Sequence, residues 1–581
     1  MGDPGRGTSG PRRGHPRRPP EYVGPGAFRS VVDPAVAASY RSDGWWGDIT
    51  IANLVASHAR TRPDRSAFVT EAGRLSWRDY HDASDRLAKV LLSSGLEAGE
   101  RLGVFLADGA TIHVSLLAAE KAGLIAVGIG ARSGDREMRH LLHATGATAL
   151  LTAADHNGDD WYERVHSMQT AGLPIRHHFV VPEFADDAGA AIVMDGRPAE
   201  DSGPGTPDLV AARRMGPDDL FLINSTSGTT GLPKCVAHTQ NSKLYMASQA
   251  IAAAEMTDAD VMLGAAPMPF GFGLFSTHFT GTVLGATVVT VDRFSADIVN
   301  QLIERERVTV LVCVSTQFKM MMTSPSFDAH DLSSLRAMFT GGEAIPYEPA
   351  SRFEKRTGAA VLNFYGSNES GMATGTTIRD SFEHRLETCG RAVAGTDVKL
   401  FDDRGDATKT GYGQPGSRGP ASCLGYYDDP AANDELFADG RYVLHADFCT
   451  IDEDGYLAVV GRRSDIIIRG GKNLSALQVE NEVMAHPDVG LVAAVAMPDA
   501  LFGERVCVFV ELVGDADVTL EELTAFMVRR GVSKELLPES LVVVDTLPRS
   551  AGGKVAKGTL RLEAERRAMT REGDVHEPDP E

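Results

Sequence analysis

The chain has 581 residues, of which 43% are hydrophobic and 23% charged, so it can bury large cores and is too long for one compact domain. Its 57 basic and 79 acidic residues give a formal charge of −22, which argues against duplex nucleic acid or an anionic membrane surface as the main partner. The six cysteines are scattered without a CxxC pair, which indicates neither a disulfide framework nor a zinc site and favours a reducing, cytoplasmic location. No apolar run reaches the roughly 18 residues of a membrane span, so none is expected.

The predicted elements alternate between short apolar runs and helical patterns. Residues 101–107 (RLGVFLA) are typical of a buried strand, and residues 111–123 (TIHVSLLAAEKAG) of a helix that crosses to the next strand. Further buried strands are predicted at residues 308–316, 335–342 and 360–366. This alternation predicts an α/β fold with largely parallel sheets.

The pattern changes after Gly461. Residues 490–499 and 504–513 are predicted strands, and residues 519–530 (TLEELTAFMVRR) begin with a capping box from Thr519 to Glu522. A separate α+β domain of roughly a hundred residues is therefore expected towards the end of the chain.

Residues 225–234 read STSGTTGLPK and connect two predicted strands, 219–224 (DLFLIN) and 234–239 (KCVAHT). Glycines allow backbone amides to turn toward an anion, hydroxyls add donors and the final lysine adds charge, so the composition favours phosphate. A Ser/Thr-rich surface turn has the same composition, and the loop alone leaves both interpretations open. It is not a Walker A loop, because GxxxxGK[ST] does not occur.

Five further motifs give this loop a context. The chain carries GGEAIP at 341–346, NFYGSNES at 363–370, LHADF at 444–448, GRRSDIIIRGGKNLSALQVE at 461–480 and LPRSAGGKVAKGTLR at 547–561. In this order they resemble the motifs of the adenylate-forming superfamily, which includes acyl-CoA synthetases, peptide-synthetase adenylation domains and luciferases. The resemblance runs from about Trp45 to about Leu562 and favours the acyl-CoA synthetase branch.

The resemblance implies a large N-terminal domain with doubly wound sheets and a β-barrel subdomain, followed by a small, mobile α+β domain. We expect a disordered Arg/Pro/Gly-rich tail at residues 1–22 and an acid- and nucleotide-binding core at 23–461. A hinge at 462–465, a C-terminal lid domain at 466–570 and an acidic tail at 571–581 complete the expected organisation.

The resemblance also assigns roles to single residues, with ATP, Mg²⁺ and coenzyme A as ligands. The phosphates would be bound by Ser227, Gly228, Thr229, Thr230 and Lys234, and Mg²⁺ by Glu369; adenine and ribose would be bound by Gly341, Gly342, Glu343, Tyr365, Asp447 and Arg462. Asp447 suits a ribose because a carboxylate can accept from both hydroxyls. Lys554 would act in catalysis with Asn368 and Glu369, bridging the substrate carboxylate and the phosphate where negative charge builds.

The small domain of this family turns about a hinge that maps to Ser464. One arrangement would bring Lys554 to the phosphate, and the other would bring Arg469, Gly470 and Gly471 to line a tunnel for the pantetheine thiol. Glycines allow close backbone approach to that thin ligand.

The segment 267–279 (PMPFGFGLFSTHF) bears on the acid. Phe270 aligns with an aromatic gate of the family, and Gly271 with the Asp of amino-acid-adenylating relatives or the Asn of hydroxybenzoate relatives. Phe270, Gly271 and Gly366 would form the acid pocket, and without a polar anchor at 271 we expect a neutral, hydrophobic acid. Space beside Gly271 and Gly273 favours a bulky one, such as a polycyclic or terpenoid acid, whereas a buried glycine-rich turn is the alternative.

Three residues around the nucleotide depart from the family pattern. Asn368 replaces the Thr of YGxTE that contacts the α-phosphate, and His445 and Ala446 replace the Thr and Gly ahead of Asp447. Asparagine can still donate a hydrogen bond but is longer, and about 1.4 kcal/mol of lost transition-state stabilisation lowers a rate tenfold. Ala446 adds a Cβ to a tight turn.

Three hypotheses follow. The first is a ligase that makes acyl-CoA, AMP and pyrophosphate from a small carboxylic acid, ATP and coenzyme A. The second keeps only thioester formation and receives acyl-AMP from a separate adenylating enzyme; a related variant loads the phosphopantetheine arm of a carrier protein. The third is a binding protein that senses acyl-AMP or CoA without turnover, against which Lys554, Glu369 and Asp447 argue. The identity of the acid and the oligomeric state, a homodimer included, stay open.

Overall fold

The computed structural model describes Phe28 and residues 32–156, 158–200, 206–226, 232–342, 345–402, 404–462, 465–469, 472–499, 501–549 and 554–573. The tail predicted at residues 1–22 and positions 574–581 of the predicted acidic tail lie outside this range.

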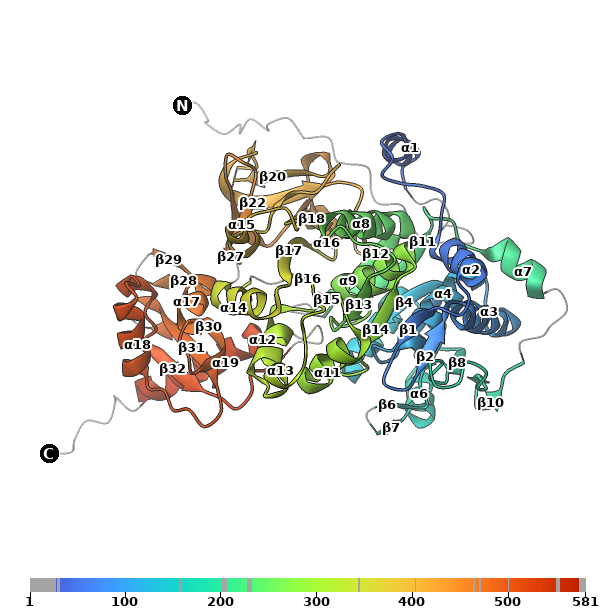
Figure 1. Cartoon of the computed structure of the whole chain (residues 1–581), viewed down its shortest axis with the longest axis horizontal. Coiled ribbons are helices and arrows are strands. Elements are labelled where there is room, and N and C mark those ends of the chain that lie inside the picture. The colour runs from blue at the N-terminus through green and yellow to red at the C-terminus, as the bar shows by residue number, and fades with distance from the viewer. Residues whose placement is uncertain are drawn as a thin grey trace, which may run out of the picture.

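A nine-stranded sheet occupies the middle of the molecule (Figure 1). Its strands follow one another in the order β19 (Arg391–Ala392), β18 (Gly371–Gly375), β17 (Ala360–Ser367), β16 (Ala337–Gly341), β15 (Val310–Val312), β13 (Val261–Gly264), β14 (Thr287–Thr290), β1 (Ser66–Val69) and β2 (Arg74–Ser76). The strands from β17 to β1 run parallel, and the pairs at both edges are antiparallel. The central strands are buried along nearly their whole length, as expected of parallel strands covered on both faces.

A second nine-stranded sheet contains the strands on either side of the predicted phosphate loop. Its order is β10 (Arg197–Pro198), β9 (Val193–Met194), β8 (His177–Val180), β5 (Ala149–Thr152), β3 (Arg101–Phe105), β4 (Ile125–Ile129), β11 (Leu220–Ser225), β12 (Cys235–Thr239) and β23 (Gly425–Tyr426). The run from β8 to β11 is parallel, whereas β11, β12 and β23 pair antiparallel.

Helices pack between and around these sheets. α4 (Ala110–Ala122) is buried at every residue, because its ALVI-rich sequence lies in the core shared by both sheets. α8 (Gln240–Ala253) follows β12 directly and packs against the π-helix η1 (Leu274–Thr280) and against β18. The other helices of this part are α1 (Pro34–Ser42), α2 (Ile51–Thr61), α3 (Trp77–Ser93), α5 (Asp135–Thr145), α6 (Trp161–Thr170), α7 (Thr206–Arg213), α9 (Gly271–Gly273), α10 (Gly281–Leu284), α11 (Ala296–Glu306), α12 (Ser315–Thr323), α13 (Ser326–Ala329), α14 (Tyr347–Thr357), α15 (Phe382–Glu387) and α16 (Pro430–Leu436).

The predicted β subdomain is a seven-stranded antiparallel sheet. It contains β20 (Asp397–Phe401), β21 (Ala407–Thr408), β22 (Gly411–Arg418), β24 (Phe437–Ala438), β25 (Tyr442–Leu444), β26 (Asp447–Ile451) and β27 (Leu457–Arg462). β22 joins its two halves, because residues 411–413 pair with β26 and residues 416–417 with β25.

The C-terminal part, red in Figure 1, is a five-stranded sheet with helices on both faces. The strands are β28 (Ile466–Arg469), β29 (Lys472–Ser475), β30 (Val489–Asp499), β31 (Gly503–Leu512) and β32 (Ser540–Val543); the helices are α17 (Ala476–Met484), α18 (Leu520–Arg529) and α19 (Lys557–Gly573). Alternate residues of β30 and β31 build one core under α17 and α18 and another under α19. The capping box predicted at Thr519 and Glu522 begins α18.

Ion pairs join the start of this domain to its last helix. Asp465, which directly follows the undescribed residues 463–464, pairs with Lys557 at 3.3 Å and with Arg561. Lys557 also contacts Glu480 of α17 at 2.8 Å. These pairs are half-buried or deeper, so they fix α19 to the first residues of the domain.

The predicted fold class is confirmed, with α/β sheets in the large part and α+β in the small one. In the part of the chain that the structure describes, no helix combines the length and apolarity needed to cross a bilayer.

Candidate active site

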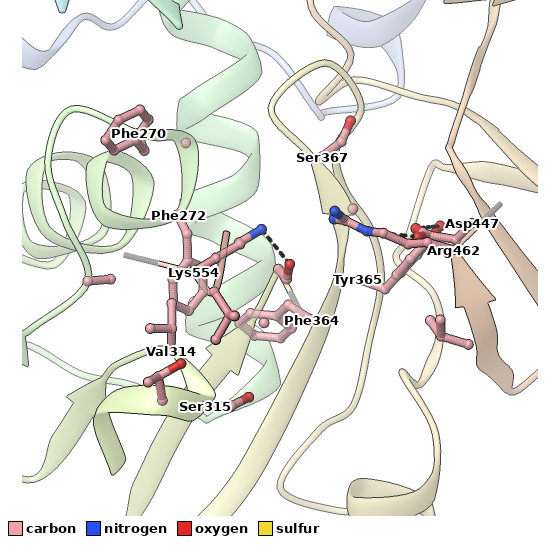
Figure 2. A pocket seen from close by; sticks show the side chains of 18 of the residues that line it. Phe270, Phe272, Val314, Ser315, Phe364, Tyr365, Ser367, Asp447, Arg462 and Lys554 are labelled. Carbon is pink, nitrogen blue, oxygen red and sulfur yellow. Dashed lines mark hydrogen bonds and ion pairs between the residues drawn. The ribbon is translucent and has the colours of Figure 1, made fainter. Parts of the chain in front are cut away.

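A cavity of about 470 Å³ lies where β11, β16 and β17 end, between the two large sheets, the β subdomain and the C-terminal domain (Figure 2). Ligands of α/β proteins characteristically bind at these carboxyl ends of strands. The cavity is lined by the predicted residues Phe270, Gly271, Gly341, Gly342, Tyr365, Gly366, Asn368, Glu369, Asp447, Arg462 and Lys554.

Three side chains predicted to bind adenine and ribose form one hydrogen-bonded group. Tyr365 Oη donates to Asp447 Oδ2 at 2.8 Å, and Arg462 Nε lies 3.4 Å from Asp447 Oδ1. Asp447 and Arg462 face each other across the β26–β27 pair. Burial and the neighbouring Asp447 raise the pKa of Tyr365 well above its usual value, so the phenol stays a neutral donor.

His445 and Ala446 have different surroundings. The His445 ring stacks on Tyr365 with 5.0 Å between centroids and an interplanar angle of 26°, and its Nε2 lies 3.1 Å from Ser417 Oγ. His445 does not line the cavity, so it covers the face of Tyr365 turned away from it. Ala446 is exposed and has no positive φ. The backbone at Ala446 therefore accommodates a Cβ without strain, and its effect on a bound ribose stays a prediction.

Lys554 reaches the cavity from the C-terminal domain. Its Nζ donates to the carbonyl oxygen of Gly342 at 2.5 Å (Figure 2). Gly342 has a φ of 79°, a left-handed conformation that glycine adopts without strain. The loop at Gly342 thereby turns its carbonyl toward the lysine.

Asn368 points toward β11 and Gly271. Its Nδ2 donates to Asn224 Oδ1 at 2.7 Å, and that oxygen also lies 2.8 Å from His238 Nε2. Asn368 Oδ1 is buried without a hydrogen-bond partner among the described residues, and a Cβ built on Gly271 would lie 2.9 Å from it. Gly271 therefore accommodates Asn368.

Both pocket glycines line the cavity, but the positions that a Cβ would take on them are already filled by the protein. Asn368 occupies the position beside Gly271, and a Cβ on Gly273 would meet the carbonyl oxygen of Pro267 at 2.4 Å. Both glycines permit close packing, as in the alternative of a buried glycine-rich turn. The acid side of the cavity is nevertheless apolar, with Met246, Phe270, Phe272, Phe275, Val314, Phe364 and Met372 in its lining.

Glu369 and Lys234 meet at Tyr426, a residue that the sequence did not single out. Tyr426 Oη donates to Glu369 Oε1 at 2.7 Å, and Lys234 Nζ lies 4.7 Å from the centre of the Tyr426 ring. Lys234 itself does not line the cavity. Within the described residues, no three His, Cys, Asp or Glu side chains gather to hold a metal ion. A cation beside Glu369 would need oxygen ligands from a phosphate, which is the usual way Mg²⁺ binds with nucleotides.

Of the remaining predicted residues, only Arg469 is described. It pairs with Glu539 at 3.2 Å inside the C-terminal domain and does not line the cavity. The other predictions fall outside the described residues: Ser227, Gly228, Thr229 and Thr230 of the predicted phosphate loop, Glu343, Ser464 of the predicted hinge, and Gly470 and Gly471 of the predicted tunnel.

The lining residues that sequence reasoning missed include two with buried polar groups, Ser225 at the end of β11 and Lys243 in α8. Both have a buried polar atom, Ser225 Oγ and Lys243 Nζ, without a hydrogen-bond partner among the described residues. Ser225 begins the quoted STSGTTGLPK motif, which was a usable signal. Lys243 has no motif around it.

Comparison with known proteins decides the family. A model described as "AMP-binding enzyme" matches residues 55–427, and one described as "AMP-binding enzyme C-terminal domain" matches residues 478–554. The chain belongs to the AMP-binding enzyme family. Membership confirms the predicted superfamily, its acyl-CoA synthetase branch and the enzyme class, an AMP-forming acid–thiol ligase.

Relatives within the family cover almost the whole chain. The medium-chain fatty-acid–CoA ligase of Escherichia coli K12 is 30% identical over 91% of this chain and 93% of its own length. The salicyl-AMP ligase / salicyl-S-ArCP synthetase of Mycobacterium tuberculosis is 30% identical over 94% of this chain and 96% of its own. A crystal structure of an anthranilate CoA ligase with anthranoyl-AMP superposes with a TM-score of 0.79 at 22% identity, covering 90% of this chain and 98% of that one, which shows the shared fold.

Proposed function

We propose that this enzyme joins a hydrophobic carboxylic acid to coenzyme A through an acyl adenylate. The acid's carboxylate oxygen attacks the α-phosphorus of ATP, the bond to pyrophosphate breaks, and the thiol then displaces AMP from the acyl carbon and loses its proton. The observation that carries the proposal is Lys554 Nζ at Gly342 O, inside the cavity that also holds the Tyr365–Asp447–Arg462 group.

The residues present fit the first step. Negative charge grows on the phosphate as the carboxylate attacks, and a lysine ammonium held at the cavity stabilises that charge without rearrangement. Arg462 and Asp447 offer a donor and an acceptor for sugar hydroxyls, and the buried Tyr365 lines the cavity with the ring face that His445 does not cover, which offers a stacking surface. Glu369 would hold a Mg²⁺ ion, which supplies positive charge between the phosphates when bound.

The second hypothesis, thioester formation from a preformed adenylate, has one supporting observation. Asn368 directs its donor into Asn224 and leaves its oxygen, an acceptor, beside Gly271, so neither atom is an evident donor to the α-phosphate. The relative from M. tuberculosis is named as a salicyl-S-ArCP synthetase. For that reason we retain a carrier-protein thiol as an alternative acceptor to coenzyme A.

A pair of assays on the wild type and on Lys554→Ala tests the proposal. Acid-dependent pyrophosphate release reports the first step, and thioester formation from synthetic acyl-AMP and coenzyme A reports the second. We expect Lys554→Ala to lose pyrophosphate release by at least about a hundredfold, as expected when a preorganised transition-state donor is removed, and to keep most of the thioester activity. Lys409→Ala, whose side chain is 76% exposed in the β subdomain, is the matched control and should behave as wild type.

Thioester formation by the wild type without any pyrophosphate release, across aliphatic and aromatic acids, would establish the second hypothesis instead. Equal loss of both steps in Lys554→Ala would contradict the role given to that lysine. Product from a phosphopantetheinylated carrier protein but not from coenzyme A would identify the variant acceptor.

A further inference from the structure

Lys243 is a fully buried lysine whose ammonium group has no hydrogen-bond partner in the described part of the chain. It lies in the first turn of α8, and its side chain is 0% exposed. Cys423 and Glu369 both act to raise its pKa, yet no hydrogen bond or ion pair joins Lys243 to Glu369 in the described structure, and Glu369 Oε1 accepts from Tyr426. Burying a charge without partners is costly, so proteins rarely retain one without a use.

The other fully buried lysine of the described chain shows the ordinary solution. Lys121 in α4 is also 0% exposed, but its Nζ donates to Asp85 Oδ1 at 2.6 Å and to Ser84 Oγ at 2.8 Å. The fold thus supplies a structural lysine with hydrogen-bond partners, although burial still lowers the pKa of Lys121. Lys243 differs because its polar end is left for a group that the chain does not provide.

The position of Lys243 identifies where that group would come from. Lys243 lines the cavity together with Met246, which lies three residues further on the same face of α8. The apolar residues Phe272, Phe275 and Met372 line the same cavity. Lys554 enters from the C-terminal domain and already contacts Gly342, so the reacting carboxylate has a different cation.

We propose that Lys243 binds a second acceptor group of the substrate, an acidic oxygen carried on the acid in addition to its reacting carboxylate. A hydroxyl on an aromatic acid and the far carboxylate of a dicarboxylic acid share this chemistry. The inference rests on the proposed function for the identity of the ligand as an acid. It replaces the expectation of a wholly neutral acid, because the polar anchor missing at Gly271 is supplied from α8.

Binding measurements test this independently of turnover. Calorimetry with the full-length protein and a non-hydrolysable ATP analogue would compare two matched pairs, benzoate with 2-hydroxybenzoate and octanoate with octanedioate. In the wild type, the acid with the second oxygen should bind more tightly in at least one pair. Lys243→Met should reduce that preference by about tenfold or more, the usual effect of losing a buried charged hydrogen bond, and should change the affinities for the plain acid and the ATP analogue less than about threefold.

Two control variants distinguish recognition of a second substrate oxygen from a non-specific effect on acid binding. Met246→Leu, on the same face of α8, should change both members of a pair alike, and Lys243→Gln should keep part of the preference for a hydroxyl while losing that for a carboxylate. A Lys243-dependent preference in the benzoate pair would identify a hydroxyl as the second oxygen, and one in the octanoate pair would identify a carboxylate.

Other outcomes overturn the inference. Equal weakening of both acids, an effect confined to the ATP analogue, or no preference in either wild-type pair would each show that Lys243 does not recognise a second oxygen. If the preference depended on Lys243 in a protein that releases no pyrophosphate and forms no thioester, the proposed ligase function would be contradicted. The inference that Lys243 binds a second oxygen would still stand.

Discussion

Replacing Lys243 by methionine should stabilise the protein without ligand, which is the opposite of what the same change does at Lys121. Burial lowers the pKa of Lys243 from 10.5 to about 8, against the weaker raising effects of Cys423 and Glu369. Each tenfold change in proton affinity, which is one pKa unit, corresponds to about 1.4 kcal/mol. The lowered pKa therefore means that keeping Lys243 protonated at pH 7 costs the folded protein roughly 3 kcal/mol relative to the unfolded chain. Methionine fills a similar volume without that cost.

The sign of the pH dependence follows from the same depressed pKa. Between pH 8 and 10.5 the unfolded chain binds more protons at this lysine than the folded protein, so the wild type gains stability as the pH rises through that window. The advantage of Lys243→Met should therefore be greatest at pH 7 and shrink towards pH 10. Urea unfolding of both proteins at pH 7, 8, 9 and 10 measures this difference, in which other titrating groups cancel.

Lys121→Met provides the matched comparison. Its loss removes hydrogen bonds to Asp85 and Ser84 and should destabilise the protein by about 1–3 kcal/mol at pH 7. If Lys243→Met destabilised the protein by a similar amount, or if its effect did not change between pH 7 and 10, Lys243 would have a partner in solution and the reasoning would be refuted.

Three further changes test the site. Gly271→Ala places a Cβ 2.9 Å from Asn368 Oδ1 and should slow pyrophosphate release about tenfold. Adding Asn368→Thr to that variant should recover most of the lost rate. If the two substitutions slowed release additively, the proposed contact between residues 271 and 368 would be contradicted. Tyr426→Phe removes the hydrogen-bond donor to Glu369 and should raise the Mg²⁺ concentration needed for half-maximal rate several-fold. An unchanged Mg²⁺ requirement would show that Glu369 does not bind the ion. His445→Ala uncovers one face of the Tyr365 ring and should weaken binding of the ATP analogue by roughly 0.5–1.5 kcal/mol in calorimetry. The affinity for the acid should not change. An unchanged affinity for the ATP analogue would show that the stacking of His445 on Tyr365 does not contribute to nucleotide binding.

The elements that were predictable from sequence are those whose signal is local. The run at 360–366 is found as β17 (Ala360–Ser367), and the helix expected at 111–123 is α4 (Ala110–Ala122). Short apolar runs and capping patterns depend on neighbours in the chain, so they survive without knowledge of the fold. The motifs likewise placed Tyr365, Asp447 and Lys554 at one cavity.

The residues that sequence reasoning missed depend on tertiary packing. Lys243 stands in QNSKLYMASQ, a segment whose polar and apolar residues do not separate onto faces, and only the packing of α8 between η1 and β18 buries it. The direction of Asn368 is set by Asn224, which is 144 residues away in sequence. Tyr426 acquires its role because β23 pairs with β12, and no spacing in the sequence announces that contact.

The ion pairs that tie Asp465 to α19 have a consequence for the order of events. Asp465 and Glu480, near the start of the C-terminal domain, form ion pairs with Lys557 and Arg561 of the helix that follows Lys554, so these contacts hold residue 465, α17 and α19 together. We therefore expect Lys554 and Arg469 to be carried on one rigid body, so that a rotation bringing Arg469 to the cavity would withdraw Lys554. On that expectation, the thiol-binding surface predicted around Arg469 would form only after the lysine has left.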